Sequence, residues 1–404
     1  MTIASDHYTI ISADTHGGAS HATYREYLDP EFLEDFDAWR ARYRNPFKDL
    51  GDDRRLRNWD SGMRNSQQDA DGVVGEVIYP NTIPPFFPGY VLMAPQPDDS
   101  TYRHRHAGIV AHNRWLSDFC AEFPERRAGI GQVFLNDLDD TIADVQWIKE
   151  HGLRGGILIP ALPPDATWLA QYNDPHYDRL WATCQDLDVP VNMHSGSGNP
   201  SYGTGPSAAL MYAAECLAFS NRQLLYFILG GVFERFPGLR FIMTEQRCAW
   251  VPDVLDGLDR MLADIRDRGA LGELRFKPEH VLPRSATEYF QQNVKIGVSQ
   301  PNLADAAVID RLGSDFFMWG SDYPHDEGTY PFTREHLRQV FEGRPEPVMR
   351  KILGENAAGV YGFDLDVLAG DAARFGPTAE ELAAPLEQLP ANANEALLNA
   401  MTPA

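Results

Sequence analysis

Short apolar segments recur along the chain, and most are followed by a stretch with helical periodicity. Each segment is four to six residues long and consists mainly of β-branched or other apolar residues. This pattern is typical of strands that are buried on both faces of a parallel sheet. The eight segments predict strands at residues 8–13, 75–79, 128–133, 155–159, 189–193, 240–244, 294–298 and 316–319.

Amphipathic segments between these strands predict helices. Residues 138–151 repeat apolar positions at helical spacing, begin with acidic residues and are followed by Gly152, as in a capped helix. Residues 176–187 and 251–265 show similar patterns. Eight strands that alternate with helices predict a (β/α)8 TIM barrel, in the α/β class. A doubly wound open sheet is the alternative, but the sequence has neither Gly-x-Gly-x-x-Gly after an early strand nor a P-loop.

Two stretches fall outside the alternating pattern. Residues from about 20 to 71 are rich in charged and aromatic side chains, and we expect a partly helical insertion after the first strand that forms a lid or an interface. Beyond Phe363 the chain becomes acidic and rich in alanine. Here residues 377–389 predict an amphipathic helix, and the last fifteen residues are expected to be loosely held. We therefore expect one barrel over residues 1–365 and an acidic helical tail over residues 366–404.

Composition and charge exclude several classes of protein. The 404 residues are 43% hydrophobic and 23% charged, which is a globular composition. The net charge of −23 disfavours nucleic acid and anionic membranes as partners. No apolar run approaches the roughly 20 residues that span a bilayer, and the first residues lack the apolar core of a signal peptide. The four cysteines have no Cys-x-x-Cys spacing, so we expect reduced thiols in a cytoplasmic protein.

Side chains that bind metals follow four of the predicted strands. Reactive residues of (β/α)8 barrels lie at the C-terminal ends of the strands, so these side chains are expected to meet at the barrel mouth. Taken singly, each also has a structural interpretation, such as a capping or turn residue. Imidazoles and carboxylates at one point favour a divalent metal site. They are Asp14 and His16 after the first strand, His194 after the fifth, Glu245 after the sixth, and Asp322 and His325 after the eighth.

Several of these segments resemble the amidohydrolase-related family typified by aminocarboxymuconate-semialdehyde decarboxylase, within the amidohydrolase superfamily. ISADTH is similar to the opening metal motif, and GLRGGILIP, VPVNMHSGSG and FIMTEQRCAWVPDVLDGLDR to the fourth, fifth and sixth strands. MWGSDYPHDEGTYP and KILGENAAGVYGF resemble the eighth strand and the closing helix, so the resemblance extends from about Tyr8 to Phe363. It implies that Asp14, His16, His194 and Asp322 are metal ligands and that Asp322 is also the acid/base group.

Two departures from the family pattern change what the resemblance implies. Many superfamily members bridge two metals with a carbamylated lysine at the end of the fourth strand, whereas GGILIP has none. We therefore expect one divalent ion, zinc first and manganese as the alternative. Lys295, in the seventh strand, is expected to pair or to extend to the strand end. Glu245 stands where the best-known decarboxylases carry histidine, and it is a second acid/base group, a substrate acceptor or a residue that orients a ligand.

Loops at the same end of the barrel provide candidate substrate contacts. His325 is expected to hydrogen-bond Asp322 or the substrate, or to fix its loop. Residues 84–90, PPFFPGY, form a stiff apolar loop that suits the wall of a site for an aromatic or otherwise apolar substrate. Four further side chains are candidate substrate contacts, with packing at the rim as the alternative: Tyr79, Asn81, Arg247 and Trp250.

These residues lead to three functional hypotheses. The first is hydrolysis of a small amide, lactone or ring substrate by metal-activated water, with Asp322 as the acid/base group. The second is metal-dependent, non-oxidative decarboxylation of an aromatic or unsaturated carboxylic acid, and the third is a non-catalytic barrel used as a binding module. We also expect a homodimer, because barrels with long insertions and apolar rim loops often pair.

Overall fold

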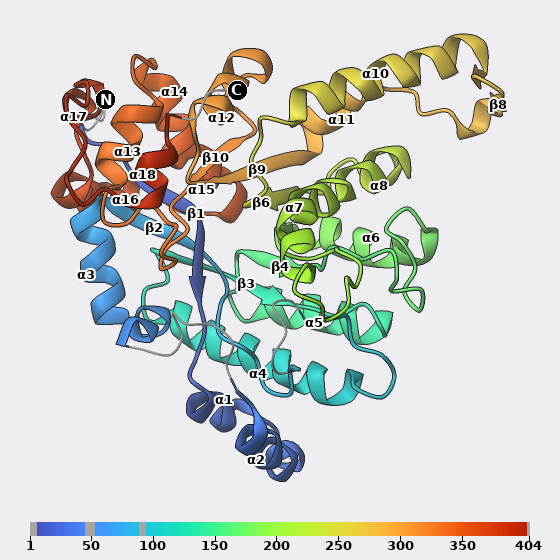
Figure 1. Ribbon diagram of the computed structural model, residues 1–404, viewed down its shortest axis with the longest axis horizontal. Helices are drawn as coiled ribbons and strands as arrows, with labels where there is room; N and C mark the ends of the chain where they lie inside the picture. The colour runs from blue at the N-terminus through green and yellow to red at the C-terminus, as the bar shows by residue number, and fades with distance from the viewer. Residues whose placement is uncertain (1–5, 45–52, 89–93, 402–404) are drawn as a thin grey trace.

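The barrel predicted from the strand pattern is present. The structure is a computed structural model that describes residues 6–44, 53–88 and 94–401. One sheet of eight strands has the order β1-β2-β3-β4-β5-β6-β9-β10, and the paired strands are parallel (Figure 1). Each strand overlaps a predicted segment. The strands are β1 (Ile10–Gly17), β2 (Val73–Pro80), β3 (Arg127–Gln132), β4 (Gly156–Leu158), β5 (Val191–His194), β6 (Phe241–Thr244), β9 (Val294–Ser299) and β10 (Phe317–Gly320).

Hydrogen bonds just beyond β10 connect the last strand to the first. The backbone N–H of Asp322 donates to Asp14 O at 2.9 Å, and that of His16 donates to Tyr323 O at 2.6 Å. These bonds bring the metal-binding motifs of β1 and β10, which are far apart in sequence, next to each other. The prediction of a (β/α)8 barrel is confirmed.

Helices surround the barrel, and the three helices predicted between strands are confirmed. None of the helices in the described part of the chain has the length and apolar character needed to cross a membrane. The three predicted helices are α5 (Leu138–Glu150), α6 (Asp178–Asp186) and α10 (Val251–Arg268). The others of the repeat are α4 (Tyr102–Ala121), α7 (Ala208–Asn221), α8 (Gln223–Leu229), α9 (Val232–Arg235), α11 (Ala286–Asn293), α12 (Leu303–Leu312), α13 (Thr333–Val340), α14 (Glu346–Arg350) and α15 (Asn356–Tyr361).

One arm of the molecule was not predicted. Helix α10 continues past the predicted end to Arg268, and the chain returns through a two-stranded hairpin, β7 (Ala270–Leu271) and β8 (Leu274–Arg275). This arm extends away from the barrel at the upper right of Figure 1. Its tip is too short and polar to give a strand pattern in the sequence, and Leu274 is 62% exposed there.

The stretch after β1 is helical where it is described. It contains α1 (His21–Tyr27), α2 (Leu33–Arg42) and α3 (Ser61–Asp71). Helices α1 and α2 lie below the barrel in Figure 1, whereas α3 lies beside β2. A small apolar cluster, which includes Phe32 and Phe36, connects the insertion to α4.

Glu76 of β2 ties α3 to the barrel through buried charges. Its carboxylate accepts hydrogen bonds from Arg64 of α3, the shortest at 2.6 Å, and from Gln68 at 2.8 Å. Arg127 of β3 lies 3.5 Å from the same carboxylate. Burial alone would raise the pKa of Glu76, but the two guanidinium groups outweigh it and lower the pKa to about 2. The insertion is thus fixed to the sheet by an ion cluster.

The C-terminal tail differs from its prediction. Only α17 (Ala379–Ala383) forms in the segment 377–389, because Pro385 stops the helix. The expectation that the last fifteen residues are loosely held is wrong for their described part, since α18 (Glu395–Asn399) packs on the barrel and Leu397 is completely buried. The remaining tail helix is α16 (Leu365–Phe375). The segment of α18 has few apolar residues in a polar sequence, so its packing on the barrel could not be predicted from the sequence.

Candidate active site

The ends of β1, β5 and β6 bring four metal-binding side chains together. Asp14 Oδ1 lies 3.3 Å from His16 Nε2 and 3.5 Å from His194 Nε2. Glu245 Oε2 lies 3.0 Å from His194 Nε2 and 4.0 Å from His16 Nε2. One atom from each of the four residues lies within 4.8 Å of the others, so they are close enough to share one ion.

Three of these atoms are buried without a hydrogen-bond partner. They are Asp14 Oδ1, His16 Nε2 and His194 Nε2. Buried polar atoms are nearly always paired, and unpaired ones are costly. Three such atoms directed at one point therefore fit a divalent cation, which would satisfy all of them.

The other polar atoms of these three side chains form contacts within the protein. His16 Nδ1 lies 3.4 Å from Pro80 O, and His194 Nδ1 lies 3.2 Å from the carbonyl of the next residue. Ser299 Oγ donates a hydrogen bond to Asp14 Oδ2. An Nδ1–H···O=C bond leaves the Nε2 lone pair free, which is the usual arrangement of metal-binding histidines.

Charge also favours a cation at this point. Burial alone would raise the pKa of Asp14, but His16 and His194 outweigh it and hold the pKa well below its ordinary value. Burial alone would lower the pKa of His194, but Glu245 and Asp14 raise it well above its ordinary value. The carboxylates thus attract positive charge, and protons and a metal ion would compete for the same imidazole nitrogens.

Asp322 forms a second group beside the first. Its Oδ1 lies 3.2 Å from His16 Nε2 and 2.7 Å from His325 Nδ1, and its Oδ2 accepts from Gln300 Nε2 at 2.6 Å. His325 Nε2 lies 3.1 Å from Asn81 Oδ1. Burial opposes the charge on His325, but Asp322 raises the pKa of the imidazole to about 10. His325 is therefore protonated at neutral pH and donates its Nδ1 proton to Asp322.

Several residues after the strands adopt left-handed backbone conformations. The φ angles are +56° at Glu245, +56° at Arg247, +35° at Gln300 and +60° at Asp322. Residues other than glycine rarely adopt such values, which cost of order 1–3 kcal/mol each and cluster at functional sites. The strain thus identifies the same end of the barrel as the unpaired atoms do.

A polar cavity of about 570 Å³ opens beside the two groups. Six of the predicted residues line it, and the structure thus brings them to one space: His16, Asn81, His194, Glu245, Arg247 and His325. Arg247 lies 3.3 Å from Asp305, which offsets its charge. The sequence analysis did not identify several other lining residues, among them Ser299, Gln300, Tyr212, Cys216, Glu327, Glu395 and Asn399.

An apolar cavity of about 280 Å³ adjoins His194 on the other side. Phe87 and Pro88 of the predicted apolar loop line it together with Val133 and Phe134, whereas Tyr90 lies outside the described residues. A planar ring fits such walls better than a charged group does. No lysine lines either this cavity or the polar one among the described residues.

Three predicted residues direct their polar groups away from the two cavities. The Tyr79 ring lines the apolar cavity, but its hydroxyl points into the barrel and lies 2.7 Å from Thr244 Oγ1. Trp250 is absent from the described lining of both cavities and donates to a backbone carbonyl of its own turn. Lys295 Nζ donates to Asp315 O at 2.8 Å, at the end of the barrel opposite the mouth.

The tail contributes one wall of the polar cavity, and Asn394 anchors it. The Asn394 amide donates to the carbonyls of Gly328, Thr329 and Tyr330 at 2.7–3.3 Å, and its oxygen caps α18 by accepting from Leu397 N at 3.1 Å.

We expect Asn394→Ala to weaken docking of α18 by about 1–2 kcal/mol. Limited proteolysis should then cut the tail faster, with little change in the melting temperature of the barrel. Equal cleavage of both proteins would contradict the anchoring role.

Comparisons with known proteins agree with the barrel fold. The sequence matches the amidohydrolase family over residues 59–363. An amidohydrolase from Mycobacterium avium subsp. paratuberculosis K-10 is similar in structure, with a TM-score of 0.67 and 18% identity over 88% of this chain and 99% of that one. So is 5-carboxyvanillate decarboxylase from Sphingomonas paucimobilis, with a TM-score of 0.60 and 20% identity over 88% and 100%.

A third solved structure was determined with a metal. It is a dihydroxybenzoic acid decarboxylase from Polaromonas sp. JS666 with bound manganese and the inhibitor 2-nitroresorcinol, with a TM-score of 0.57 and 17% identity over 88% of this chain and 97% of that one. At these identities the structural likeness shows the barrel fold, whereas the sequence match covers most of the chain. The chain therefore belongs to the amidohydrolase family of enzymes.

Proposed function

We propose that this enzyme is a metal-dependent, non-oxidative decarboxylase of an aromatic carboxylic acid, instead of the hydrolase that the sequence analysis placed first. The observation that carries the proposal is the apolar cavity next to His194, which offers a slot for a ring beside the metal-binding cluster. Similar solved structures that are decarboxylases of carboxyvanillate and dihydroxybenzoate support it.

The proposed metal site contains one ion held by Asp14, His16, His194 and Asp322, with Glu245 as a further ligand because it lies 3.0 Å from His194 Nε2. A bound divalent ion would supply positive charge that binds the carboxylate or a phenol oxygen of the substrate and stabilises negative charge as it develops. Three carboxylates with two imidazoles make an oxygen-rich set, which favours manganese over zinc.

The proposed proton source is the pair of Asp322 and His325. The bond between the ring carbon and the carboxylate breaks, the electron pair remains on the carbon, and CO2 leaves. The carbon then takes the proton that lies between Asp322 Oδ1 and His325 Nδ1, a hydrogen bond of 2.7 Å, so that the ring gains one hydrogen for the CO2 lost. Asn81, 3.1 Å from His325 Nε2, holds the imidazole in place.

A substrate panel separates decarboxylation from hydrolysis. We expect the manganese-loaded enzyme to release CO2 from at least one hydroxybenzoate, including methoxy and dicarboxylate derivatives, and to leave aryl amides and lactones intact. CO2 release and ester or amide cleavage would be followed in the same preparations. Cleavage of an amide or lactone that depends on Asp322, without CO2 release from any acid, would restore the hydrolase hypothesis.

Metal binding has its own test at His194. We expect the wild-type enzyme to hold about one manganese ion per chain and His194→Ala to bind it at least about 100-fold more weakly, because even indirect ligand changes cost 10–100-fold. Elemental analysis after dialysis against known free manganese gives both values. The matched control is His176→Ala, an exposed histidine outside both cavities, which should bind as the wild type does. Equal metal content in all three proteins would contradict the site.

Assembly and location stay predictions of the same proposal. The arm formed by α10, the hairpin and α11 exposes Leu274, which supports a homodimer in which the arm packs on a second copy. Light scattering should give twice the chain mass of 45.3 kDa, and Leu274→Asp should shift the mass toward the monomer. A monomer at micromolar concentration would contradict the homodimer. Location in the cytoplasm stays a prediction of the sequence.

A further inference from the structure

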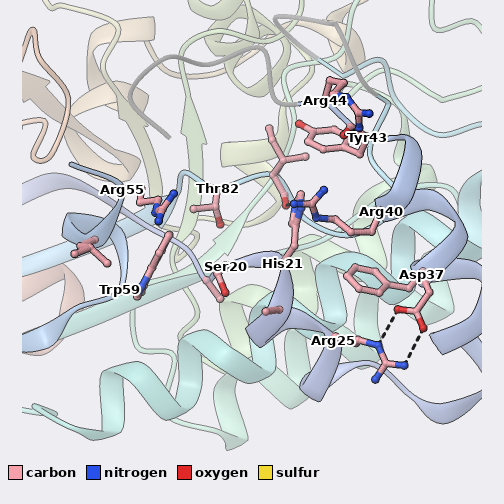
Figure 2. A pocket seen from close by; sticks show the side chains of 15 residues that line it. Ser20, His21, Arg25, Asp37, Arg40, Tyr43, Arg44, Arg55, Trp59 and Thr82 are labelled. Carbon is pink, nitrogen blue, oxygen red and sulfur yellow. Dashed lines mark hydrogen bonds and ion pairs between the residues drawn. The ribbon is translucent and has the colours of Figure 1, made fainter. Parts of the chain in front are cut away.

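A third cavity lies between the insertion and the barrel. Its volume is about 720 Å³, and its walls come from α1, α2, the segment 55–59 and the loop after β2 (Figure 2). Apart from Trp59, Thr82 and Ile83, the lining residues precede the part of the chain that matches the amidohydrolase family. The cavity is therefore a feature of the insertion and is separate from the metal-binding cluster.

Positive charge is concentrated in this cavity, although the whole chain has a net charge of −23. Four arginines and one aspartate line it. Arg25 is paired with Asp37 at 2.8 Å, and Arg44 donates to backbone carbonyls at the end of α2. The guanidinium groups of Arg40 and Arg55 make no hydrogen bond or ion pair with any residue that the structure describes. Two guanidinium groups are thus available to a ligand.

These two groups approach the cavity from different elements. Figure 2 shows Arg40 of α2 and Arg55 reaching toward the same space from opposite sides. Guanidinium groups bind carboxylate and phosphate through two parallel hydrogen bonds, so this placement suits an anion held between them. Over the rest of the surface of so acidic a protein, negatively charged side chains would repel an anionic ligand.

The remaining walls suit a flat ring. Trp59, Phe36 and Tyr43 line the cavity, and the Tyr43 hydroxyl is buried without a hydrogen-bond partner. His21 Nε2 lies 3.0 Å from Ile83 O, and burial lowers the pKa of its imidazole to about 4, so it is neutral near pH 7 and adds an uncharged aromatic surface. Aromatic rings stack on such surfaces and on arginine planes.

We propose that this cavity binds a planar organic anion, a ring that carries a carboxylate or a phosphate, with Arg40 and Arg55 as the anion-binding residues. The site goes beyond the proposed reaction and does not depend on it. Thr82 and Ile83 line both this cavity and the apolar cavity, and Asn81 precedes them. A ligand here therefore contacts the loop that holds His325 through Asn81.

The experiment measures ligand stoichiometry by calorimetry on the full-length, manganese-loaded enzyme. The probes are benzoate, adenosine monophosphate and inorganic phosphate. Benzoate or the nucleotide is expected to bind at one equivalent that survives in His194→Ala, which separates this site from the metal centre. The Arg40→Ala, Arg55→Ala double variant should weaken that equivalent about tenfold for each guanidinium lost. The matched control Arg42→Ala, on α2 outside the cavity, should leave it unchanged.

The outcomes separate the sources of the anion. Binding of benzoate alone identifies an aromatic carboxylate, and binding of the nucleotide alone identifies a ring bearing phosphate; either supports the site when the double variant loses it. The proposal is overturned if neither ring anion binds outside the metal centre, if the double variant binds as the wild type does, or if inorganic phosphate binds as tightly as the ring anions. The melting temperature of the double variant controls for loss of fold.

Discussion

Asp322→Asn is expected to slow CO2 release about 1000-fold, within the 10²–10⁴-fold range that general acid catalysis contributes. In the wild type, Asp322 Oδ1 lies 2.7 Å from His325 Nδ1 and Asp322 Oδ2 lies 2.6 Å from Gln300 Nε2. Asparagine has nearly the same shape, and its single side-chain oxygen can still accept one of these two hydrogen bonds. It lacks the negative charge that keeps His325 protonated, so the proton that the ring carbon needs is lost. The measurement is kcat for CO2 release at saturating manganese, so that any loss of metal affinity is separated from loss of the acid.

The matched control for this prediction is Asp326→Asn. Asp326 lies in the same loop but is exposed and does not line either cavity at the barrel mouth. Its variant should retain kcat within about twofold, as expected of a surface residue outside the reacting groups. An Asp322→Asn enzyme with more than a tenth of the wild-type kcat would show that another group delivers the proton.

Glu76→Gln is expected to lower the free energy of unfolding by about 3–5 kcal/mol, because it leaves the buried guanidinium group of Arg64 without a counter-charge and leaves Arg127 only the half-exposed Glu122, 3.5 Å away. Arg64 and Arg127 are both completely buried, and glutamine keeps the shape of Glu76 without its charge. Chemical denaturation at pH 7 measures the loss. Asp253→Asn is the control, since Asp253 pairs with Arg311 at an exposed site where an ion pair contributes about 0–1 kcal/mol.

The pH dependence of stability follows from the same carboxylate. Its pKa is about 2 in the folded protein against an ordinary value of 4.5. A lowered pKa stabilises the fold above the ordinary value, and the gain of about 3 kcal/mol is lost as the pH falls from about 4.5 toward 2. The difference in unfolding free energy between the wild type and Glu76→Gln should therefore shrink over this interval. A constant difference from pH 7 to pH 3 would contradict the assigned cause.

Much of the barrel could be predicted because buried parallel strands leave a local signal. Ile10 and Ile11 of β1 and Phe241 and Ile242 of β6 are fully buried, and such runs are recognisable in the sequence. The hairpin between α10 and α11 and the docked helix α18 left no such signal. The hairpin is short and polar, and the position of α18 depends on contacts with distant residues, such as the carbonyls that Asn394 meets after β10.

The candidate metal cluster was predictable for a different reason. Asp14 and His16 are two residues apart on a strand, so their convergence follows from strand geometry, and the strand ends of a barrel meet at one mouth. The same rule applied to β9 would have identified Ser299 and Gln300, which bind Asp14 and Asp322. Residues of α7 and the tail lie outside that rule.

The interpretation of the chemistry changed with the cavities. Metal-binding motifs in the sequence are equally compatible with activated water and with decarboxylation, so they do not distinguish the two reactions. The apolar walls of Phe87, Pro88 and Phe134 beside His194 became visible only in three dimensions. These walls and the similar decarboxylase structures are the reasons for proposing an aromatic acid as the substrate.

Metal titration with CO2 release as the readout tests whether decarboxylation depends on one bound metal ion. Metal-free enzyme would be titrated with manganese in the presence of the best hydroxybenzoate of the panel. We expect CO2 release to rise in proportion to bound manganese, to saturate at one equivalent per chain and to be absent from His194→Ala. Full CO2 release without bound metal, or a requirement for a second equivalent, would contradict a mononuclear decarboxylase.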